Sequence, residues 1–299
     1  MRILNRIVRW KTAASAGGEC IEWEADPRHT EIIIKQMGLT FSSKCVATPG
    51  VKVKPSSESE RPLSSDETTL FRSVCMRANF LALDRPEIQY ASKEIARSMS
   101  NPTRGAFDAL KRLARFLVGH PRTVWRYPRQ SPCRYLDNHS DSDWAGCLST
   151  RKSTSALVTM IGNHCIKTSS STQSVLALSS GEAEWYSLVK SASHGLGFIG
   201  LARDLGLDLQ LRLWTDSSAA KGIGSRRGIG KIRHLETSSL WLQRAVTDRR
   251  LTLHKDKGET NQSDVGTKHL DAKRIWYLLG RMNLHPASGV SNLAYRAAL

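Results

Sequence analysis

The sequence has no long apolar run. Its most hydrophobic stretch, around residues 157–161, has the length of a strand, whereas a helix that spans a bilayer needs roughly 18 apolar residues or more. We therefore expect no membrane partner. The sequence is also short of acidic residues, with 27 Asp and Glu against 44 Lys and Arg and a net charge of +17. A basic excess of this size attracts polyanions and favours nucleic acid as a partner.

Paired cysteine motifs are missing as well. The six cysteines are widely spaced, with no C-x-x-C motif and no Cys/His cluster at the spacing of zinc ligands. This pattern argues against a disulfide-rich secreted protein and against a common zinc site. We expect reduced thiols and a cytoplasmic or nuclear location. Four basic residues precede the first acid, Glu19, as in an organellar transit peptide, but the basic balance of the whole chain accounts for them.

Helical periodicity dominates residues 65–119. Ser65 or Asp66 is expected to cap a first helix, and Arg85-Pro86 ends its pattern. Apolar residues then recur at helical spacing over 86–99 and again over 103–119, where Gly119 stops them. The first part of the chain is therefore expected to be mostly helical.

From about residue 131 the pattern changes to short strands that alternate with helices, which is typical of an α/β domain. Gly162-Asn163 separates two strand-like runs and predicts a hairpin. Leucines alternate with polar residues over 207–213, which predicts a strand that leads to Asp216. The remaining elements are expected to be helices over 180–199 and 234–246, a strand over 250–254, and a final helical region that includes Asp264 and continues past Trp276.

Four acids stand where a predicted element begins or ends. They are Asp141, Glu184, Asp216 and Asp264. A single acid at such a place is usually a turn, cap or solvated residue. Their order along the chain is more informative, because an RNase H-like fold collects its metal-binding carboxylates from a strand, a helix, a second strand and a late helix. Such carboxylates meet at one edge of the sheet, beyond the carboxyl ends of strands.

The residues around these acids resemble the ribonuclease H domain of copia-type LTR retrotransposon polyproteins. The matching segments are SDSDWAGC, SSSTQSVLALSSGEAEWYSL, WTDSSAAKGI, KIRHLE and NQSDVGTKHL, in the same order over about residues 131–283. Further upstream, VATPGVK, FRSVCMRANFLALDRPEIQYASKEIARSMSNPT and LKRLARFLVGH resemble the stretch between the reverse transcriptase palm and that domain. The chain is thus similar to the C-terminal piece of such a polyprotein.

The resemblance implies an α/β fold in three parts. An RNase H-like mixed β-sheet flanked by helices is expected over residues 131–283. A smaller, mostly helical remnant of the reverse transcriptase and its connection region is expected over 1–130. Residues 284–299 are expected to form a C-terminal tail, and the rest of a reverse transcriptase is a further expected partner.

The resemblance also implies a ribonuclease H that hydrolyses the RNA strand of RNA/DNA hybrids by two-metal-ion catalysis. Two Mg²⁺, or Mn²⁺ in their place, would be held by Asp141, Glu184, Asp216 and Asp264, because Mg²⁺ prefers hard oxygen ligands. The sequence leaves two choices open. Asp143 is an alternative to Asp141, and Glu182 is an alternative to Glu184.

Basic residues near the third acid are expected to bind the nucleic acid. Residues 221–257 carry ten Lys and Arg against three acids, a local charge of 10 − 3 = +7. Phosphate groups bind to surfaces of this kind. The candidates for contact with the hybrid are Arg226, Arg227, Lys231, Arg233 and His234, the last of them suggested by the resemblance.

Two features limit the expected activity. A polymerase would need a Y-x-D-D metal motif, and the nearest match, residues 135–138, has Asn in place of the second Asp. No polymerase activity is therefore expected. The first predicted strand of the nuclease domain is also rich in polar residues, where a central strand favours apolar ones. The alternative function is therefore a catalytically inactive remnant that still binds nucleic acid.

Overall fold

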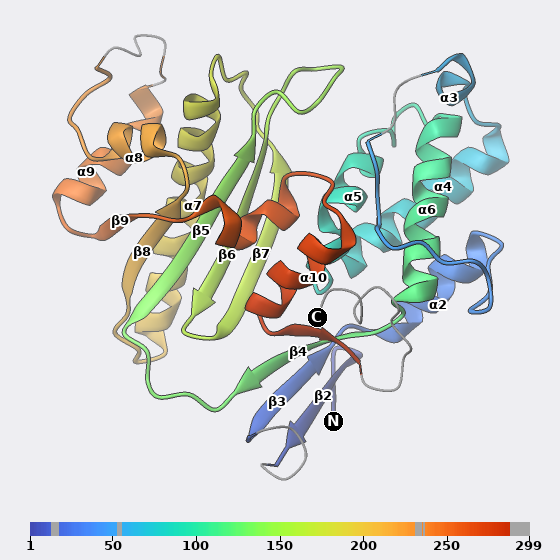
Figure 1. Cartoon of the computed structure of the whole chain (residues 1–299), viewed down its shortest axis with the longest axis horizontal. Coiled ribbons are helices and arrows are strands. Elements are labelled where there is room, and N and C mark those ends of the chain that lie inside the picture. Colours follow the sequence, from blue (N-terminus) through green and yellow to red (C-terminus); the bar gives the residue numbers. More distant parts are fainter. Residues whose placement is uncertain (13–17, 53–55, 231–234, 236, 288–299) are drawn as a thin grey trace. The chain divides into compact units, whose positions relative to one another are not determined.

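The computed structural model describes residues 1–12, 18–52, 56–230, 235 and 237–287. The chain folds as two compact units (Figure 1). Unit 1 comprises residues 1–129 and 269–299, and unit 2 comprises residues 130–268. Within the described residues, no helix combines the length and the apolar character that crossing a membrane requires.

Unit 1 contains a five-stranded antiparallel sheet in the order β1-β2-β3-β4-β10. Its strands are β1 (Arg2–Ile3), β2 (Arg6–Lys11), β3 (Cys20–Glu24), β4 (Thr123–Pro128) and β10 (Leu284–Pro286). This sheet was not predicted from the sequence. Its strands carry charged residues at inward positions, and these are tolerated because they are paired: Glu24 is 2% exposed and accepts hydrogen bonds from Arg9 and Arg122.

The helices of unit 1 are α2 (Pro27–Gln36), α3 (Ser57–Glu60), α4 (Ser65–Leu81), α5 (Pro86–Ala96), α6 (Arg104–Gly119) and α10 (Ala272–Arg281). Three of them, α4, α5 and α6, follow the predicted periodicity, whereas α2 and α3 were not predicted. Ser64 caps α4, one residue before the predicted cap, in a capping box with Glu67. Thr103 caps α6 through the backbone N–H of Ala106.

The division into units differs from the predicted one at its C-terminal end. Residues 269–283 were expected in the nuclease domain and 284–299 in a tail. In the structure β10 pairs with β4, with Leu284 opposite Trp125, and residues from His269 onward belong to unit 1. This segment completes the sheet of unit 1. Because residues 269–299 belong to unit 1, that unit contains more residues than unit 2 and is not the smaller one.

Unit 2 is built on a mixed five-stranded sheet in the order β7-β6-β5-β8-β9. Strand β5 (Tyr135–Asp143) runs antiparallel to β6 (Thr154–Ile161), which pairs with β7 (His164–Thr172) in the predicted hairpin. On its other side β5 runs parallel to β8 (Gln210–Thr215), and β8 runs parallel to β9 (Leu251–Lys255). The RNase H-like mixed sheet is thus confirmed, with β5 at its centre.

The helices of unit 2 are α7 (Ser180–Asp204), α8 (Ser218–Gly224) and α9 (Trp241–Thr247), with short 3₁₀ turns η1 (Thr237–Ser239), η2 (Gly258–Thr260) and η3 (Gln262–Gly266). Ser179 caps α7 by accepting a hydrogen bond from the backbone N–H of Glu182. The single final helical region that was predicted around Asp264 is two elements: η3 holds Asp264, and α10 begins separately after its cap, Asp271.

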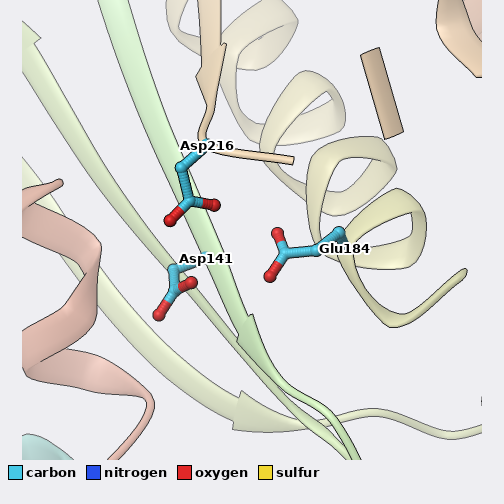
Figure 2. A group of neighbouring side chains, drawn as sticks. All are labelled: Asp141, Glu184 and Asp216. Carbon is cyan, nitrogen blue, oxygen red and sulfur yellow. The ribbon is translucent and has the colours of Figure 1, made fainter. Parts of the chain in front are cut away.

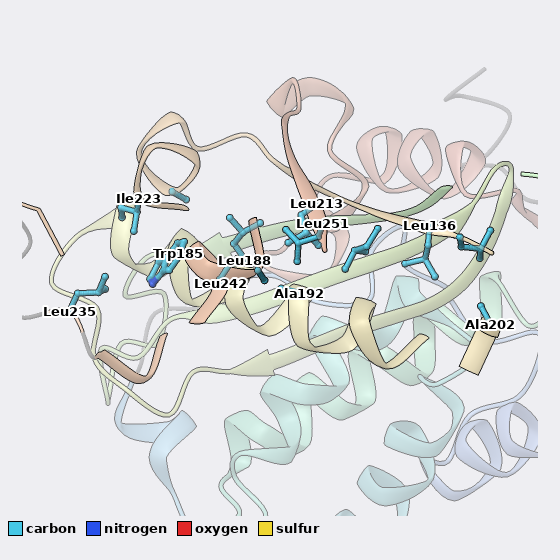
Figure 3. Close-up of a cluster of buried hydrophobic side chains, with 14 residues drawn as sticks. Leu136, Trp185, Leu188, Ala192, Ala202, Leu213, Ile223, Leu235, Leu242 and Leu251 are labelled. Carbon is cyan, nitrogen blue, oxygen red and sulfur yellow. The ribbon is translucent and has the colours of Figure 1, made fainter. Parts of the chain in front are cut away.

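Helix α7 covers one face of this sheet and encloses the core of unit 2 (Figure 3). The alternation along β8 explains how: Leu211 and Leu213 point into the core, while Arg212 and Trp214 lie on the opposite face. The large buried side chain of Trp185 completes the packing, and its indole N–H donates to Ser239 Oγ at 2.9 Å. The core side chains shared by β5, β8, β9 and α7 are Leu136, Leu211, Leu213, Leu251, Trp185, Leu188 and Ala192.

The polar residues of β5 have specific partners. Asn138 donates to the Ser191 carbonyl at 2.7 Å, and Ser140 Oγ donates to the Trp214 carbonyl at 3.1 Å. Asp137, the acid of the degenerate polymerase-like motif, pairs with Arg212 at 2.6 Å. A polar residue can occupy a buried strand when it forms hydrogen bonds there, so these contacts help a central strand to form from this sequence.

Candidate functional site

Three of the four predicted acids meet at one edge of the unit 2 sheet (Figure 2). Asp141 lies on β5, Glu184 lies in the second turn of α7, and Asp216 directly follows β8. One carboxylate oxygen from each lies within 4.8 Å of the other two. The parallel pairing of β5 with β8, in which Ser140 is opposite Thr215, brings Asp141 and Asp216 together.

Asp141 is the most deeply placed of the three, at 3% exposed. Thr267 Oγ1 donates a hydrogen bond to its Oδ2, and Ser187 Oγ donates to its backbone carbonyl at 2.7 Å. Burial raises the pKa of Asp141 well above its usual range, and the negative charge of Glu184 raises it further. The side chain is therefore fixed in place but costly to ionise without a cation.

Glu184 is 9% exposed and is held by one neighbour. The backbone N–H of Ser142 and its Oγ donate to Glu184 Oε1 at 3.1 and 2.9 Å. Glu184 Oε2 is buried without a hydrogen-bond partner among the described residues. Burial and the charge of Asp216 raise the pKa of Glu184 to about 7. A buried acceptor of this kind is available to a water molecule or a cation.

Asp216 is half-buried, and the segment after β9 lies beside it. Lys255 Nζ donates to the backbone carbonyl of Asp216. A side chain on Gly258 would begin 3.3 Å from Asp216 Oδ2, so the glycine keeps this approach open. Burial, followed by the charge of Asp264, raises the pKa of Asp216.

The fourth predicted ligand, Asp264, does not belong to this group in the described part of the chain. Its Oδ1 lies 2.6 Å from Lys268 Nζ, which is also 3.9 Å from Asp141 Oδ2. Burial alone would lower the pKa of Lys268, but the charges of Asp141 and Asp264 raise it. Asp264 therefore lies near the three acids, with an ammonium group as its partner.

The neighbouring acids that the sequence left open have other contacts. Asp143 accepts a hydrogen bond from the backbone N–H of Thr154 across the end of the β5–β6 pair. Glu182 accepts from the backbone N–H of Leu178 at 2.8 Å, just before α7. Neither acid belongs to the carboxylate group among the residues described. Ser142 and Lys268 were not singled out from the sequence, although they lie within the motifs SDSDWAGC and NQSDVGTKHL.

Only part of the predicted nucleic-acid surface can be placed. Lys231, Arg233 and His234 lie outside the described residues. Arg226 folds back, and its Nη2 donates to the Ile229 carbonyl at 2.7 Å, so this residue supports its own loop. Arg227 is exposed. Of the two arginines, Arg227 is therefore the one available to an incoming phosphate.

The donor set of the three acids fits a hard divalent cation. Carboxylate oxygens are the ligands that Mg²⁺ and Mn²⁺ prefer. Three acids within reach of one ion repel one another when it is absent, which agrees with their raised pKa values. The unpartnered Oε2 of Glu184 adds an acceptor that a cation would satisfy.

Comparison with known sequences gives relatives among transposon proteins. No family model matches the chain. It is 34% identical over 170 residues to an uncharacterized mitochondrial protein of Arabidopsis thaliana, across 56% of this chain and 68% of that protein. It is 30% identical over 169 residues to the retrovirus-related Pol polyprotein from transposon RE2 of the same plant, and 23% identical over 279 residues to that from transposon TNT 1-94 of Nicotiana tabacum. These matches cover 56% and 88% of this chain, but only 12% and 20% of the polyproteins.

Similarity to solved structures is weaker. RNase H1 from Halobacterium salinarum NRC-1 is 14% identical with a TM-score of 0.29, over 44% of this chain and 94% of that one. A foamy viral protease-reverse transcriptase in complex with dsDNA is 13% identical with a TM-score of 0.43, over 66% and 42%. The strand order of unit 2 and the sequence relatives are the stronger observations. They confirm the predicted resemblance: the chain belongs to the family of retrovirus-related Pol polyproteins of transposons.

Proposed function

We propose that unit 2 is a ribonuclease H that hydrolyses the RNA strand of RNA/DNA hybrids with two Mg²⁺ ions, as in copia-type elements. The observation that carries this proposal is the convergence of Asp141, Glu184 and Asp216 within 4.8 Å at the end of parallel strands. Mn²⁺ is the expected substitute for Mg²⁺.

Asp141, Glu184 and Asp216 would hold the cation, and Asp264 would complete the set for a second one. When bound, a pair of divalent cations activates a water molecule and stabilises the leaving oxygen of a phosphodiester. The protein positions the ligands beforehand. Ser142 fixes Glu184, and Thr267 fixes Asp141, and such supporting hydrogen bonds tune both metal affinity and activity.

The charge of the chain supports a polyanionic substrate. A net charge of +17 attracts a hybrid to the protein, while the acids are confined to the edge of one sheet. Exposed Arg227 is the best-placed described candidate for a phosphate contact, and we propose Lys231, Arg233 and His234 as further contacts. Recognition of the RNA strand would require a contact with its 2′-hydroxyl group.

Cleavage of a labelled hybrid tests the proposal. The full chain is incubated with an RNA/DNA hybrid in Mg²⁺, and an Asp216→Asn variant is the control. We expect cuts in the RNA strand only, loss of activity in EDTA, and loss of activity in the variant. Cleavage that equals that of Asp216→Asn would reject the enzymatic function.

The same samples distinguish the inactive remnant. That alternative predicts binding of the hybrid without turnover, with an affinity that falls steeply with salt because counterion release becomes less favourable. Binding is measured in EDTA by fluorescence anisotropy at two salt concentrations. Asp216→Asn should bind at least as well as the unchanged chain, because it removes a negative charge.

A further inference from the structure

Lys268 lies close to two of the four acids. Its Nζ lies 2.6 Å from Asp264 Oδ1 and 3.9 Å from Asp141 Oδ2. The two acids are 9% and 5% exposed at their side chains, whereas that of Lys268 is 49% exposed. The side chain of Lys268 is thus partly exposed to solvent, while its ammonium group contacts buried carboxylates.

This contact divides the acids into two kinds. Asp141, Glu184 and Asp216 present oxygens to one another within 4.8 Å. Asp264 instead directs an oxygen to the ammonium group at the distance of a charge-assisted hydrogen bond. A cation that binds Asp264 would have to replace a positive charge that is already there.

We propose that Lys268 is the resident counter-ion of the carboxylate group and competes with a divalent cation for Asp264. In the metal-free protein, the ammonium group of Lys268 would then lie beside Asp141, Glu184 and Asp216, and these three acids would remain available to a cation. A cation that uses Asp264 displaces Lys268, which can move because its long side chain is flexible and partly exposed. The inference rests on the proposed function only in taking these acids to bind a divalent cation.

Metal binding to a neutral variant tests the competition. Lys268→Met removes the charge and keeps much of the stem, and Lys167→Met removes an exposed lysine of β7 in the same unit as a control for net charge. In calorimetric titrations with Mg²⁺, Lys268→Met should bind on the order of tenfold more tightly, a typical size for coupled binding events. Lys167→Met should bind as the unchanged chain does. Equal or weaker binding by Lys268→Met would overturn the proposal.

A double variant tests the role of Asp264. If Lys268 competes at this acid, adding Lys268→Met to an Asp264→Asn background should change Mg²⁺ affinity much less than it does in the unchanged background. The same gain in both backgrounds would show that the lysine acts elsewhere, and would reject Asp264 as the contested ligand.

The unchanged protein offers a measurement that does not depend on whether a variant folds. Saturating Mg²⁺ should raise the rate at which an amine-reactive reagent modifies Lys268, because displacement frees the ammonium group. Peptide mass spectrometry follows Lys268 and, as an internal reference, Lys167. A rate at Lys268 that is unchanged or lower in Mg²⁺, relative to Lys167, contradicts displacement.

These tests separate the inference from the proposed function. None of them measures cleavage. A chain that cuts no hybrid but shows the predicted Mg²⁺ affinities would refute only the nuclease function. A chain that cuts the hybrid while Lys268→Met leaves Mg²⁺ affinity unchanged would refute only the role of Lys268.

Discussion

Ser142 holds Glu184 with two hydrogen bonds to the same oxygen. Its backbone N–H and its Oγ donate to Glu184 Oε1 at 3.1 and 2.9 Å, which leaves Oε2 without a partner among the described residues. The contact joins β5 to α7 one residue from Asp141. It fixes one oxygen of the glutamate and leaves the other available to a ligand.

Removing the hydroxyl of Ser142 should weaken metal binding. Ser142→Ala loses the Oγ bond and keeps the backbone bond, so we expect Mg²⁺ affinity to fall about tenfold, as for other residues that orient a ligand. Calorimetric titration measures the change. Ser142→Thr keeps a hydroxyl and should retain most of the affinity, and an alanine variant with unchanged affinity would show that the backbone bond is sufficient.

Asp141 and Asp143 should respond differently to substitution. Asp141→Asn is expected to abolish measurable Mg²⁺ binding and hybrid cleavage without lowering the stability of the metal-free protein, because ionisation of Asp141 is already unfavourable. Asp143→Ala should leave Mg²⁺ affinity nearly unchanged but cost about 1 kcal/mol of unfolding free energy, because the Thr154 N–H loses its acceptor. Calorimetry and urea unfolding measure the two effects. The reverse pattern would identify Asp143 as the ligand.

Metal-free stability should fall as pH rises from about 4.5 to 7. The folded chain raises the pKa of Glu184 from 4.5 to about 7, so it retains a proton that the unfolded chain releases. This stabilisation is fully present below pH 4.5, the pKa of Glu184 in the unfolded chain. It is lost as the pH rises through about 7, the pKa of Glu184 in the folded chain. The total loss is roughly 3 kcal/mol at most. Urea unfolding in EDTA at pH 5 and 7.5 measures the loss.

Glu184→Gln is the control for this pH dependence. Half-buried histidines such as His269 and His285, whose pKa is lowered by desolvation, act in the opposite sense in both proteins. The difference between the two pH profiles therefore reports the titration of Glu184 together with its effect on the pKa of Asp141. Mg²⁺ should also flatten the profile of the unchanged chain. Parallel profiles for the two proteins in EDTA would contradict the raised pKa.

Trp185 should contribute strongly to the stability of unit 2. Its side chain is fully buried and its indole N–H is bonded to Ser239. Trp185→Ala is expected to cost about 3–5 kcal/mol of unfolding free energy, because it leaves a cavity and an unpaired hydroxyl partner. Leu201→Ala, at a 53% exposed position on the same helix, should change it by only about 0.5 kcal/mol. A similar cost for both variants would show that α7 does not pack as described.

The helices and the hairpin of unit 2 could be predicted because their signals are local. Apolar spacing predicted α4, α5 and α6, and Gly162-Asn163 predicted the turn between β6 and β7. The sheet of unit 1 could not be predicted in this way. Its inward-facing Glu24 is stabilised by Arg122, 98 residues away, and only the folded chain brings the two together.

The sequence by itself determined which residue types end the strands of unit 2 and begin its long helix, because hydrophobic spacing and caps are properties of neighbouring residues. It could not choose between Asp141 and Asp143. Residues two apart on a strand point to the same face, so only their positions along β5 separate them. The tertiary structure also decided the partner of Asp264, because the three-carboxylate group and Lys268 are assembled from segments up to 127 positions apart. Electrostatic interactions act across space, and the spacing of charges along the chain does not specify them.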